Sequence, residues 1–424
     1  MRPLCTSILR CLLILAGLCL CGLARAQAPV RPDGDEDVLR EIDRMMNVLQ
    51  LIRKNYVDID KVSTAELFKG ALAGMVESLD DFSNFLPPPE FQSLMDDTDG
   101  QFGGIGVTVN ALDGRVVIVS VVKDGPGYKA GLQVGDAIHA VDGIRLTQED
   151  ASNMALRLRG KAGTRVKVSV LRPDAKGAFD EGAPLEFDIE RAMIKVPSIL
   201  AAQVLEGGVG FVRIKQFMEP TADDLRKVLM DFEKQMVNGL IMDLRGNPGG
   251  LLESAVAVCS MFLPTRSLVV TVKQHSDSHE NRESERYHEH FSVPGYHFND
   301  KVKMIVLIDG ESASASEITA ACLRDHRRAV LMGERSFGKG SVQSIIDLDD
   351  GSAIKLTVAR YYPPDPKRPT IDGNGIEPDI RESLNPNVIP ALDAGFEEGR
   401  VNLELDAQLA RALEVLKSFP VLNR

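Results

Sequence analysis

Residues 303–318, KMIVLIDGESASASEI, place an apolar run, a loop of small residues and the start of a helix one directly after another. The run KMIVLID has the length and continuous apolar character of a buried strand. A serine in the loop that follows would lie at a helix N-terminus, where backbone N–H groups can hold an oxyanion. Ser312, Ser314 and Ser316 can equally be caps and small packing residues, so the local pattern does not select one of them.

The stretches on either side repeat this alternation of strand and helix. Helical runs are predicted at 251–262 and 314–326. The strands predicted from residue 209 onward read VGFVRI, GLIMDLR, SLVVTV, KMIVLID, AVLMGE and SAIKLTVARYY. Strands that alternate with helices favour a layered α/β core.

A second turn of interest lies in MDLRGNPGG, residues 242–250, where a buried strand turns into a helix and exposes backbone N–H groups. An ordinary glycine turn has the same composition, so this motif is weak alone. The turn and the serine loop follow successive strands, and such turns can line one crevice in an α/β core.

The stretch GERSFGKG, residues 333–340, contains a lysine between glycines. It nearly matches the phosphate-binding loop G-x-x-x-x-G-K-[ST], but Gly340 replaces the Ser or Thr that would bind magnesium. The residues that follow, SVQSIIDL, favour a strand, whereas phosphates need a helix N-terminus there. Ser336 and Lys339 also form S-x-x-K, yet the S-D-N and K-T-G partners of that motif do not occur in the sequence.

Short strands separated by glycine turns occupy residues 102–194, with one helix predicted at 147–158. Pro87-Pro88-Pro89 marks the boundary before this region. Apolar residues at helical spacing predict helices at 35–57, 64–79 and 404–417. Because the apolar stripes of these helices have no obvious partner in the core, we expect the helices to mediate self-association, which a mass measurement in solution tests.

Composition narrows the possible functions. The 424 residues are 44% hydrophobic, so the chain can bury two or three domain cores. A net charge of −12 and the absence of Trp argue against nucleic-acid binding. Five of the seven histidines fall between 275 and 297, where His288-x-His290 and His275-x3-His279 have a spacing that could ligate a metal. The segment is so rich in Ser, Glu and Arg that we interpret it as a solvated excursion and expect no metal site.

The first 26 residues have the pattern of a signal peptide. Arg2 and Arg10 precede the uncharged run CLLILAGLCLCGLA, and Ala24-Arg25-Ala26 fits an A-x-A cleavage site. An uncleaved N-terminal anchor is the alternative. Four of the six cysteines lie in this segment. Cys259 and Cys322 lie in apolar helical stretches, where buried thiols are the default and one optional disulfide is the alternative.

Six motifs in order resemble the carboxyl-terminal processing proteases, the tail-specific serine peptidases of the S41 type. The motifs are FSNFLPPPEF, GQFGGIGV, DLRGNPGG, ESASASEI, SFGKGSVQ and GIEPDI, and the similarity runs from about residue 35 to 380. The resemblance implies a catalytic dyad of Ser314 and Lys339, with Gln343 orienting the lysine. It places oxyanion donors at Gly249 or Gly250, and the amide of Ala315 is the natural second donor.

The resemblance also implies a PDZ domain. GGIGV, residues Gly103, Gly104, Ile105, Gly106 and Val107, resembles its carboxylate-binding loop, to which a substrate C-terminus adds as a strand. The expected fold class is therefore α/β (mixed α+β) and multidomain, an α/β protease core with an inserted PDZ domain and helical terminal segments. The expected domains are a signal peptide (1–26), an N-terminal helical segment (27–96), the PDZ domain (97–193), the protease core (194–380) and a C-terminal helical extension (381–424).

The chemistry of a lysine base fits this sequence. A lysine with its ordinary pKa is protonated, and burial lowers that pKa. Phe337, Gly338 and Gly340 can desolvate Lys339 without placing an acid next to it. One departure from the family pattern is Asp80-Asp81-Phe82-Ser83, where Asp-Pro-His-Ser is frequent, and we interpret that motif as structural.

The expected function is a periplasmic endopeptidase without a cofactor, released by cleavage after Ala26. Its expected partners are unfolded or tail-bearing protein substrates and further copies of the chain, and the resemblance leaves open an adaptor protein and membrane association through partners. An inactive PDZ scaffold of the same fold and an NTPase are the competing hypotheses. Intact Ser314, Lys339 and Gln343 speak against the scaffold.

Overall fold

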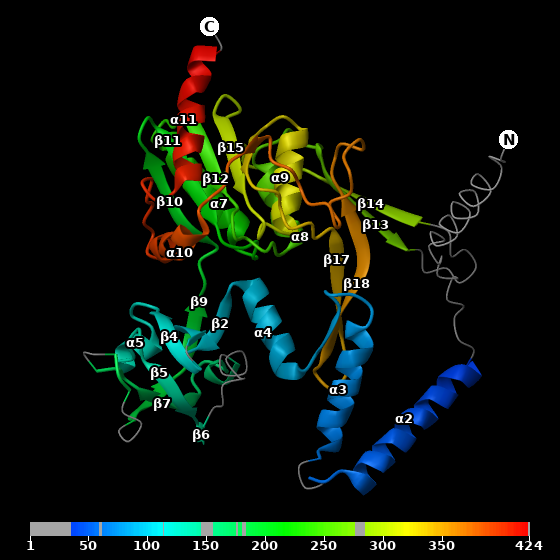
Figure 1. Ribbon diagram of the computed structural model, residues 1–424. Helices are drawn as coiled ribbons and strands as arrows, with labels where there is room; N and C mark the ends of the chain where they lie inside the picture. The colour runs from blue at the N-terminus through cyan, green and yellow to red at the C-terminus, as the bar shows by residue number, and fades with distance from the viewer. Residues whose placement is uncertain are drawn as a thin grey trace, which may run out of the picture. The chain divides into compact units, whose positions relative to one another are not determined.

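A computed structural model of the chain (Figure 1) describes residues 35–58, 62–112, 114–145, 156–174, 177–179, 184–275 and 285–422. The predicted signal peptide lies outside these residues, as do 276–284 of the histidine-rich segment. Two compact units divide the chain, one reaching to Gly70 and the other running from Ala71 onward.

The predicted helices near the N-terminus are confirmed as α2 (Asp35–Asn55) and α3 (Thr64–Glu77). The apolar stripe of α2 is exposed to solvent: Leu39 is 61% and Leu51 is 59% exposed. Self-association through this stripe therefore stays a prediction.

A six-stranded sheet forms the centre of the second unit. Its order is β10-β11-β12-β15-β16-β19. The strands are parallel except for β10, which pairs antiparallel with β11. Their bounds are β10 (Ile199–Leu205), β11 (Val209–Ile214), β12 (Gly239–Asp243), β15 (Lys303–Ile308), β16 (Val330–Gly333) and β19 (Ile380–Arg381). Parallel strands end at one edge of a sheet, so the turns after β12, β15 and β16 lie at the same edge.

Helices cover both faces of this sheet (Figure 1), which explains its continuous apolar strands. One face packs against α7 (Thr221–Lys234), α8 (Leu252–Ser260) and α9 (Ala315–Asp325). The other packs against α10 (Ile389–Glu397) and α11 (Ala407–Leu422). Successive side chains of β12 alternate between the two cores: Leu240 and Met242 lie in the first, and Ile241 lies in the second.

The position of α11 corrects one prediction. Its apolar stripe was expected to lack a partner in the core, but Leu409, Leu413 and Leu416 are buried against the sheet. Each fully buried leucine contributes about 1.5–3 kcal/mol to folding. The argument for self-association through 404–417 is therefore wrong, because an amphipathic stripe does not reveal which surface will cover it.

A second sheet is built around β18 (Ala353–Tyr362), in the order β1-β18-β13-β14 with β17 also paired to β18. The other members are β1 (Asn84–Leu86), β13 (Leu268–His275), β14 (Glu285–Phe291) and β17 (Ser341–Asp347). The strand β17 confirms that no helix follows the glycine-flanked lysine, as the phosphate-loop hypothesis would require. The triple proline begins a further helix, α4 (Pro88–Asp99), in whose first turn proline is tolerated.

Residues 101–195 form a β-rich domain and a two-stranded ribbon. The ribbon pairs β2 (Gln101–Gly104) with β9 (Ala192–Lys195). The domain sheet has the order β3-β4-β5-β7-β8, with β6 paired to β5, and α5 (Pro126–Ala130) belongs to the same domain. Its strands are β3 (Val107–Leu112), β4 (Arg115–Val121), β5 (Ala137–Val141), β6 (Ile144–Arg145), β7 (Arg165–Leu171) and β8 (Leu185–Glu190). Of the helix predicted at 147–158, residues 146–155 lie outside the described residues.

Candidate active site

Ser314 occupies the junction between β15 and α9. Its backbone has φ 54° and ψ −115°, a conformation that non-glycine residues rarely adopt. Such strain is typical of residues held in place for function. Ser314 is half-buried, whereas Ser312 and Ser316 are fully buried. The structure thus singles out Ser314 among the three serines as the one that opens toward solvent.

The two buried serines fasten the loop to the turn after β12. The hydroxyl of Ser312 donates to the carbonyl of Leu244 at 2.8 Å. The hydroxyl of Ser316 donates to the carbonyl of Asn247 at 2.9 Å. The serine loop and the N-P-G-G turn therefore form one rigid piece.

Gly249 lies directly against the serine loop. Its φ is +101°, and a Cβ atom there would lie 2.7 Å from both the carbonyl oxygen of Ala313 and Cβ of Ser314. The amide of Gly249 donates to Oδ1 of Asn247 at 2.9 Å, so it is already used within the turn. Of the predicted oxyanion donors, Gly250 and Ala315 remain. Ala315 begins α9, so its amide has no acceptor within the helix.

Lys339 is half-buried in the loop between β16 and β17. A Cβ atom at Gly340 would lie 2.3 Å from the amide nitrogen of Asp372. Only glycine at position 340 therefore allows the backbone next to the lysine to approach Asp372 this closely. Nζ of Lys339 lies 4.8 Å from the centre of the Phe82 ring. Among the described residues, no hydrogen bond joins this Nζ to the hydroxyl of Ser314.

The surroundings of Lys339 favour its neutral form. Burial lowers the pKa of Lys339 below its ordinary value, and the charge of Lys355 lowers it further. The carboxylates of Asp80 and Glu317 oppose this effect but do not reverse it. A larger fraction of Lys339 is therefore neutral, and able to accept a proton, than would be so in water.

One buried carboxylate links the serine loop to the lysine loop. Oε2 of Glu317 accepts hydrogen bonds from the amides of Ser314 at 2.9 Å and Lys339 at 2.8 Å. Oε1 accepts from the hydroxyl of Ser336 at 2.6 Å and the amide of Gly338 at 2.8 Å. Burial raises the pKa of Glu317, and these four donors only partly offset the rise. Sequence reasoning missed Glu317, although Ser314-x-x-Glu317 has capping-box spacing.

Tyr361 of β18 is a second residue that the sequence did not indicate. Its hydroxyl donates to the carbonyl of Lys339. Burial and the nearby charge of Glu317 raise the pKa of Tyr361, so the phenol stays protonated. The side chain of Ser314 partly offsets this rise in the pKa of Tyr361, so the phenol lies near both members of the predicted dyad.

Gln343 lies on β17 and does not bond directly to Lys339 through its amide nitrogen. Its Nε2 donates to the hydroxyls of Ser341 at 2.9 Å and Thr357 at 3.1 Å. Among the described residues, no hydrogen bond joins Gln343 to Nζ of Lys339, so its role in orienting the lysine stays a prediction, for which the carbonyl oxygen Oε1 is available.

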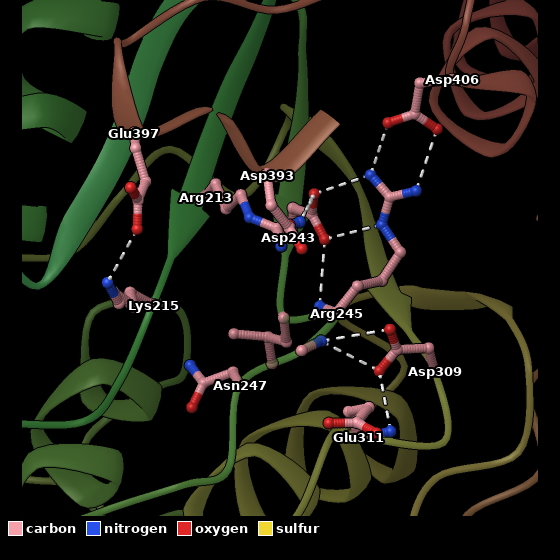
Figure 2. A network of polar contacts seen from close by, with 12 residues as sticks. Arg213, Lys215, Asp243, Arg245, Asn247, Asp309, Glu311, Asp393, Glu397 and Asp406 are labelled. Carbon is pink, nitrogen blue, oxygen red and sulfur yellow. Dashed lines mark hydrogen bonds and ion pairs between the residues drawn. The ribbon is translucent and has the colours of Figure 1, made fainter. Parts of the chain in front are cut away.

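Figure 2 shows the network that supports the turn after β12. The guanidinium of Arg245 is bound between two carboxylates, with Nη2 at 2.7 Å from an oxygen of Asp243 and at 2.7 Å from one of Asp406. Burial would raise the pKa of Asp243, but the charges of Arg245 and Arg213 hold it at about 2. The next residue, Gly246, donates its amide to the carboxylate of Asp309 at 3.0 Å. Asp406 immediately precedes α11, so the C-terminal segment stabilises the predicted oxyanion turn.

The predicted carboxylate-binding loop lies at the start of the β-rich domain. Gly103 and Gly104 pair with β9, and the side chain of Ile105 is buried in the domain core. Gly106 has φ +72° and leads into Val107, the first residue of β3. This strand is the end member of its sheet, so its outer edge is the one to which a peptide strand could add.

Two further properties concern only the described residues. Within the described ranges, no group of three or more His, Cys, Asp or Glu side chains has an arrangement that could hold a metal ion. No helix in the described part of the chain has the length and apolar character needed to cross a membrane.

Comparisons with known proteins agree with this architecture. The sequence model of Peptidase family S41 matches residues 208–382, and that of the PDZ domain matches residues 103–190. A structure solved for an S41 protease candidate of Bacteroides fragilis has the same fold, with a TM-score of 0.50 and 20% identity over 92% of this chain and 99% of that one. These matches define a serine peptidase that carries a PDZ domain.

Sequence relatives make the assignment more specific. The carboxy-terminal-processing protease of Bartonella bacilliformis is 34% identical over 355 residues, which are 83% of this chain and 77% of the relative. The carboxy-terminal processing protease CtpB of Bacillus subtilis is 33% identical over 84% of this chain and 70% of the relative. The chain belongs to the carboxy-terminal processing protease family.

Proposed function

We propose that this peptidase cleaves peptide bonds with a dyad of Ser314 and Lys339 and selects substrates by their C-termini. The observation that carries the dyad is the Glu317 carboxylate, which binds the backbone amides of both residues. The buried side chain of Glu317 therefore binds the backbones of two residues. One is Ser314, the serine of its loop that is only half-buried, and the other is Lys339, whose pKa is lowered.

The reaction follows from this arrangement. Neutral Lys339 accepts the proton of the Ser314 hydroxyl while the serine oxygen bonds to the scissile carbonyl carbon. The amides of Ala315 and Gly250 stabilise the oxyanion that forms. Protonated Lys339 then gives its proton to the leaving amine, which leaves an acyl group on Ser314. A water molecule, deprotonated by Lys339, hydrolyses this ester and restores the serine.

An assay on an unfolded protein and on a folded one tests this function directly. We expect the unfolded protein to be cleaved and the folded one spared, because a peptide strand must reach the half-buried serine. The Ser314→Ala variant, purified alongside, serves as a blank for contaminating peptidases. Binding of peptides without cleavage would instead support the inactive PDZ scaffold.

Recognition of a free C-terminus should appear in the cleavage rate. Successive amides of residues 103–107 can bind one carboxylate, and the outer edge of β3, which pairs with no strand among the described residues, can pair with the residues before it. Amidation removes the charge, so we expect cleavage of a peptide with a small apolar last residue to slow about tenfold. Steady-state rates on the matched acid and amide peptides measure the effect. Equal rates would exclude this loop from recognition.

We also propose that the protein acts in the periplasm after loss of its first 26 residues. The support is the apolar run and the A-x-A site described from the sequence. The exported protein should begin at Gln27, which N-terminal sequencing determines. A mature form that still starts at Met1 would favour the uncleaved anchor. Self-association through α2 and an adaptor protein remain proposals of the same kind.

A further inference from the structure

The turn Asp80-Asp81-Phe82-Ser83 is firmly built and tied to β18. Oδ1 of Asp80 accepts from the amides of Phe82 at 2.8 Å and Ser83 at 2.9 Å, and Oδ2 accepts from the hydroxyl of Ser83 at 2.9 Å. The strand after the turn, β1, pairs with β18 so that Asn84 lies opposite Lys355. The turn precedes both segments matched by family models, 103–190 and 208–382.

A chain of hydrogen bonds runs from this turn to Gln343. The hydroxyl of Thr357 donates to Oδ1 of Asp80 at 3.2 Å. Nε2 of Gln343 donates in turn to the hydroxyl of Thr357 at 3.1 Å and to that of Ser341 at 2.9 Å. Ser83 strengthens the junction, because its hydroxyl accepts from the amide of Thr357 at 3.1 Å.

The direction of these hydrogen bonds is set by Asp80. Burial would raise the pKa of Asp80, but the hydrogen bonds of Phe82, Ser83 and Thr357 hold it below its ordinary value, so the carboxylate can only accept. The single hydroxyl hydrogen of Thr357 must then point to Asp80, which leaves its oxygen to accept from Gln343. Both amide hydrogens of Gln343 are thereby used, and Oε1 remains as its acceptor.

The same turn borders the catalytic lysine. The ring of Phe82 lies 4.8 Å from Nζ of Lys339. The charged groups that act on this Nζ come from several elements: Asp80 from the turn, Lys355 from β18 and Glu317 from α9, while the Tyr361 hydroxyl of β18 bonds to the backbone carbonyl of Lys339. The turn therefore supplies the carboxylate at one end of the hydrogen-bond chain and the aromatic ring next to the lysine.

We propose that Asp80 and Thr357 are positioning residues that fix the Gln343 amide with Oε1 toward the amine of Lys339. The inference rests on the proposed Ser314–Lys339 mechanism and adds to it a turn that lies ahead of the PDZ domain in sequence. It also revises the interpretation of the Asp-Asp-Phe-Ser motif as purely structural.

Three threonine variants test the hydrogen-bond chain. Thr357→Val keeps the shape of the side chain but removes the hydroxyl, so the Gln343 amide loses the partner that sets its orientation. We expect kcat to fall about tenfold with little change in KM. Thr357→Ser restores the hydroxyl and should recover most of the rate. Thr271→Val, on β13 of the same sheet, is the matched control and should leave kcat unchanged.

An Asp80→Asn variant adds a measurement that a purely structural role would not change. The Asp80 carboxylate favours the ammonium form of Lys339, so its removal lowers the pKa of Lys339. The acid limb of the kcat/KM profile should move to lower pH, while in Thr357→Val it should stay in place because no charge changes. Thermal unfolding of each variant tests whether it is folded. If Thr357→Val does not fold, the pH profile of Asp80→Asn alone tests the proposal.

Two outcomes would overturn the proposal: wild-type kcat in Thr357→Val, or an acid limb that does not move in Asp80→Asn. Failure of the underlying mechanism is recognised separately. In that case Ser314→Ala, measured on the same substrate, would keep its activity.

Discussion

Replacing Lys339 by arginine is expected to lower kcat by a factor of about 10³ or more. The guanidinium keeps the positive charge but stays protonated at every accessible pH, so it cannot accept the proton of the Ser314 hydroxyl. A positioned general base contributes about 10²–10⁴ in rate, and this substitution removes that contribution. In the wild type, burial lowers the pKa of Lys339, so kcat/KM should rise with pH through a pKa below the ordinary lysine value. Initial rates on an unfolded protein across the pH range measure both effects.

The control for this variant is Lys367→Arg, because Lys367 is exposed on a loop and absent from the contacts of the site. It should retain the wild-type rate and pH profile. Substantial activity in Lys339→Arg would exclude a lysine base, since the new side chain has no neutral form to accept a proton.

Replacing Glu317 by glutamine should lower kcat about 10²-fold, although size and shape barely change. Each oxygen of the Glu317 carboxylate accepts two hydrogen bonds. Glutamine has one acceptor oxygen and one NH₂ group, so in either orientation a donor faces two donors. A buried polar group left without its partner costs about 1–3 kcal/mol. Depending on the orientation of the glutamine, the two lost hydrogen bonds are those to the amides of Ser314 and Lys339 or those to the neighbouring loop. The acid limb of kcat/KM should also move to lower pH, because the Glu317 charge raises the pKa of Lys339.

Glu311→Gln is the matched control for this change. Glu311 lies on the loop just before α9, is exposed, and its backbone amide rather than its side chain bonds to Asp309. Thermal unfolding of both variants shows whether either has lost stability. A lower kcat in a folded Glu317→Gln enzyme then reports lost positioning of the dyad. A Glu317→Gln enzyme with wild-type kcat and an unmoved pH profile would show that this carboxylate does not position the dyad.

Much of the fold could be predicted because buried parallel strands are continuous apolar runs. The predicted strand in 303–309 matches β15 (Lys303–Ile308), and that in 209–214 matches β11. The helix α7 escaped prediction, and Pro87-Pro88-Pro89 was interpreted as a boundary rather than as the beginning of α4. Proline is compatible with the first turn of a helix, so the same residues fit both interpretations.

The candidate site could be predicted only where its residues form contiguous motifs. Ser314 and Lys339 stand in recognisable glycine- and serine-rich turns at strand ends. Tyr361 and Thr357 are ordinary members of a strand, and their importance arises from hydrogen bonds across 22 and 277 residues of sequence, to Lys339 and Asp80 respectively. No local pattern reveals such pairings, because they depend on how β18 pairs with β1 and β17.

The position of Asp406 has a consequence for the order in which the parts of the core are completed. Arg245, buried next to the predicted oxyanion turn, is bound by Asp243 on one side and by Asp406 on the other. A growing chain makes Asp243 and Arg245 more than one hundred residues before Asp406 and α11. Until then, the guanidinium lacks its second carboxylate, and the sheet face that α11 will cover is open to water. The predicted oxyanion turn is therefore among the last parts of the core to be completed, because one of the two carboxylates that hold Arg245 belongs to the C-terminal segment.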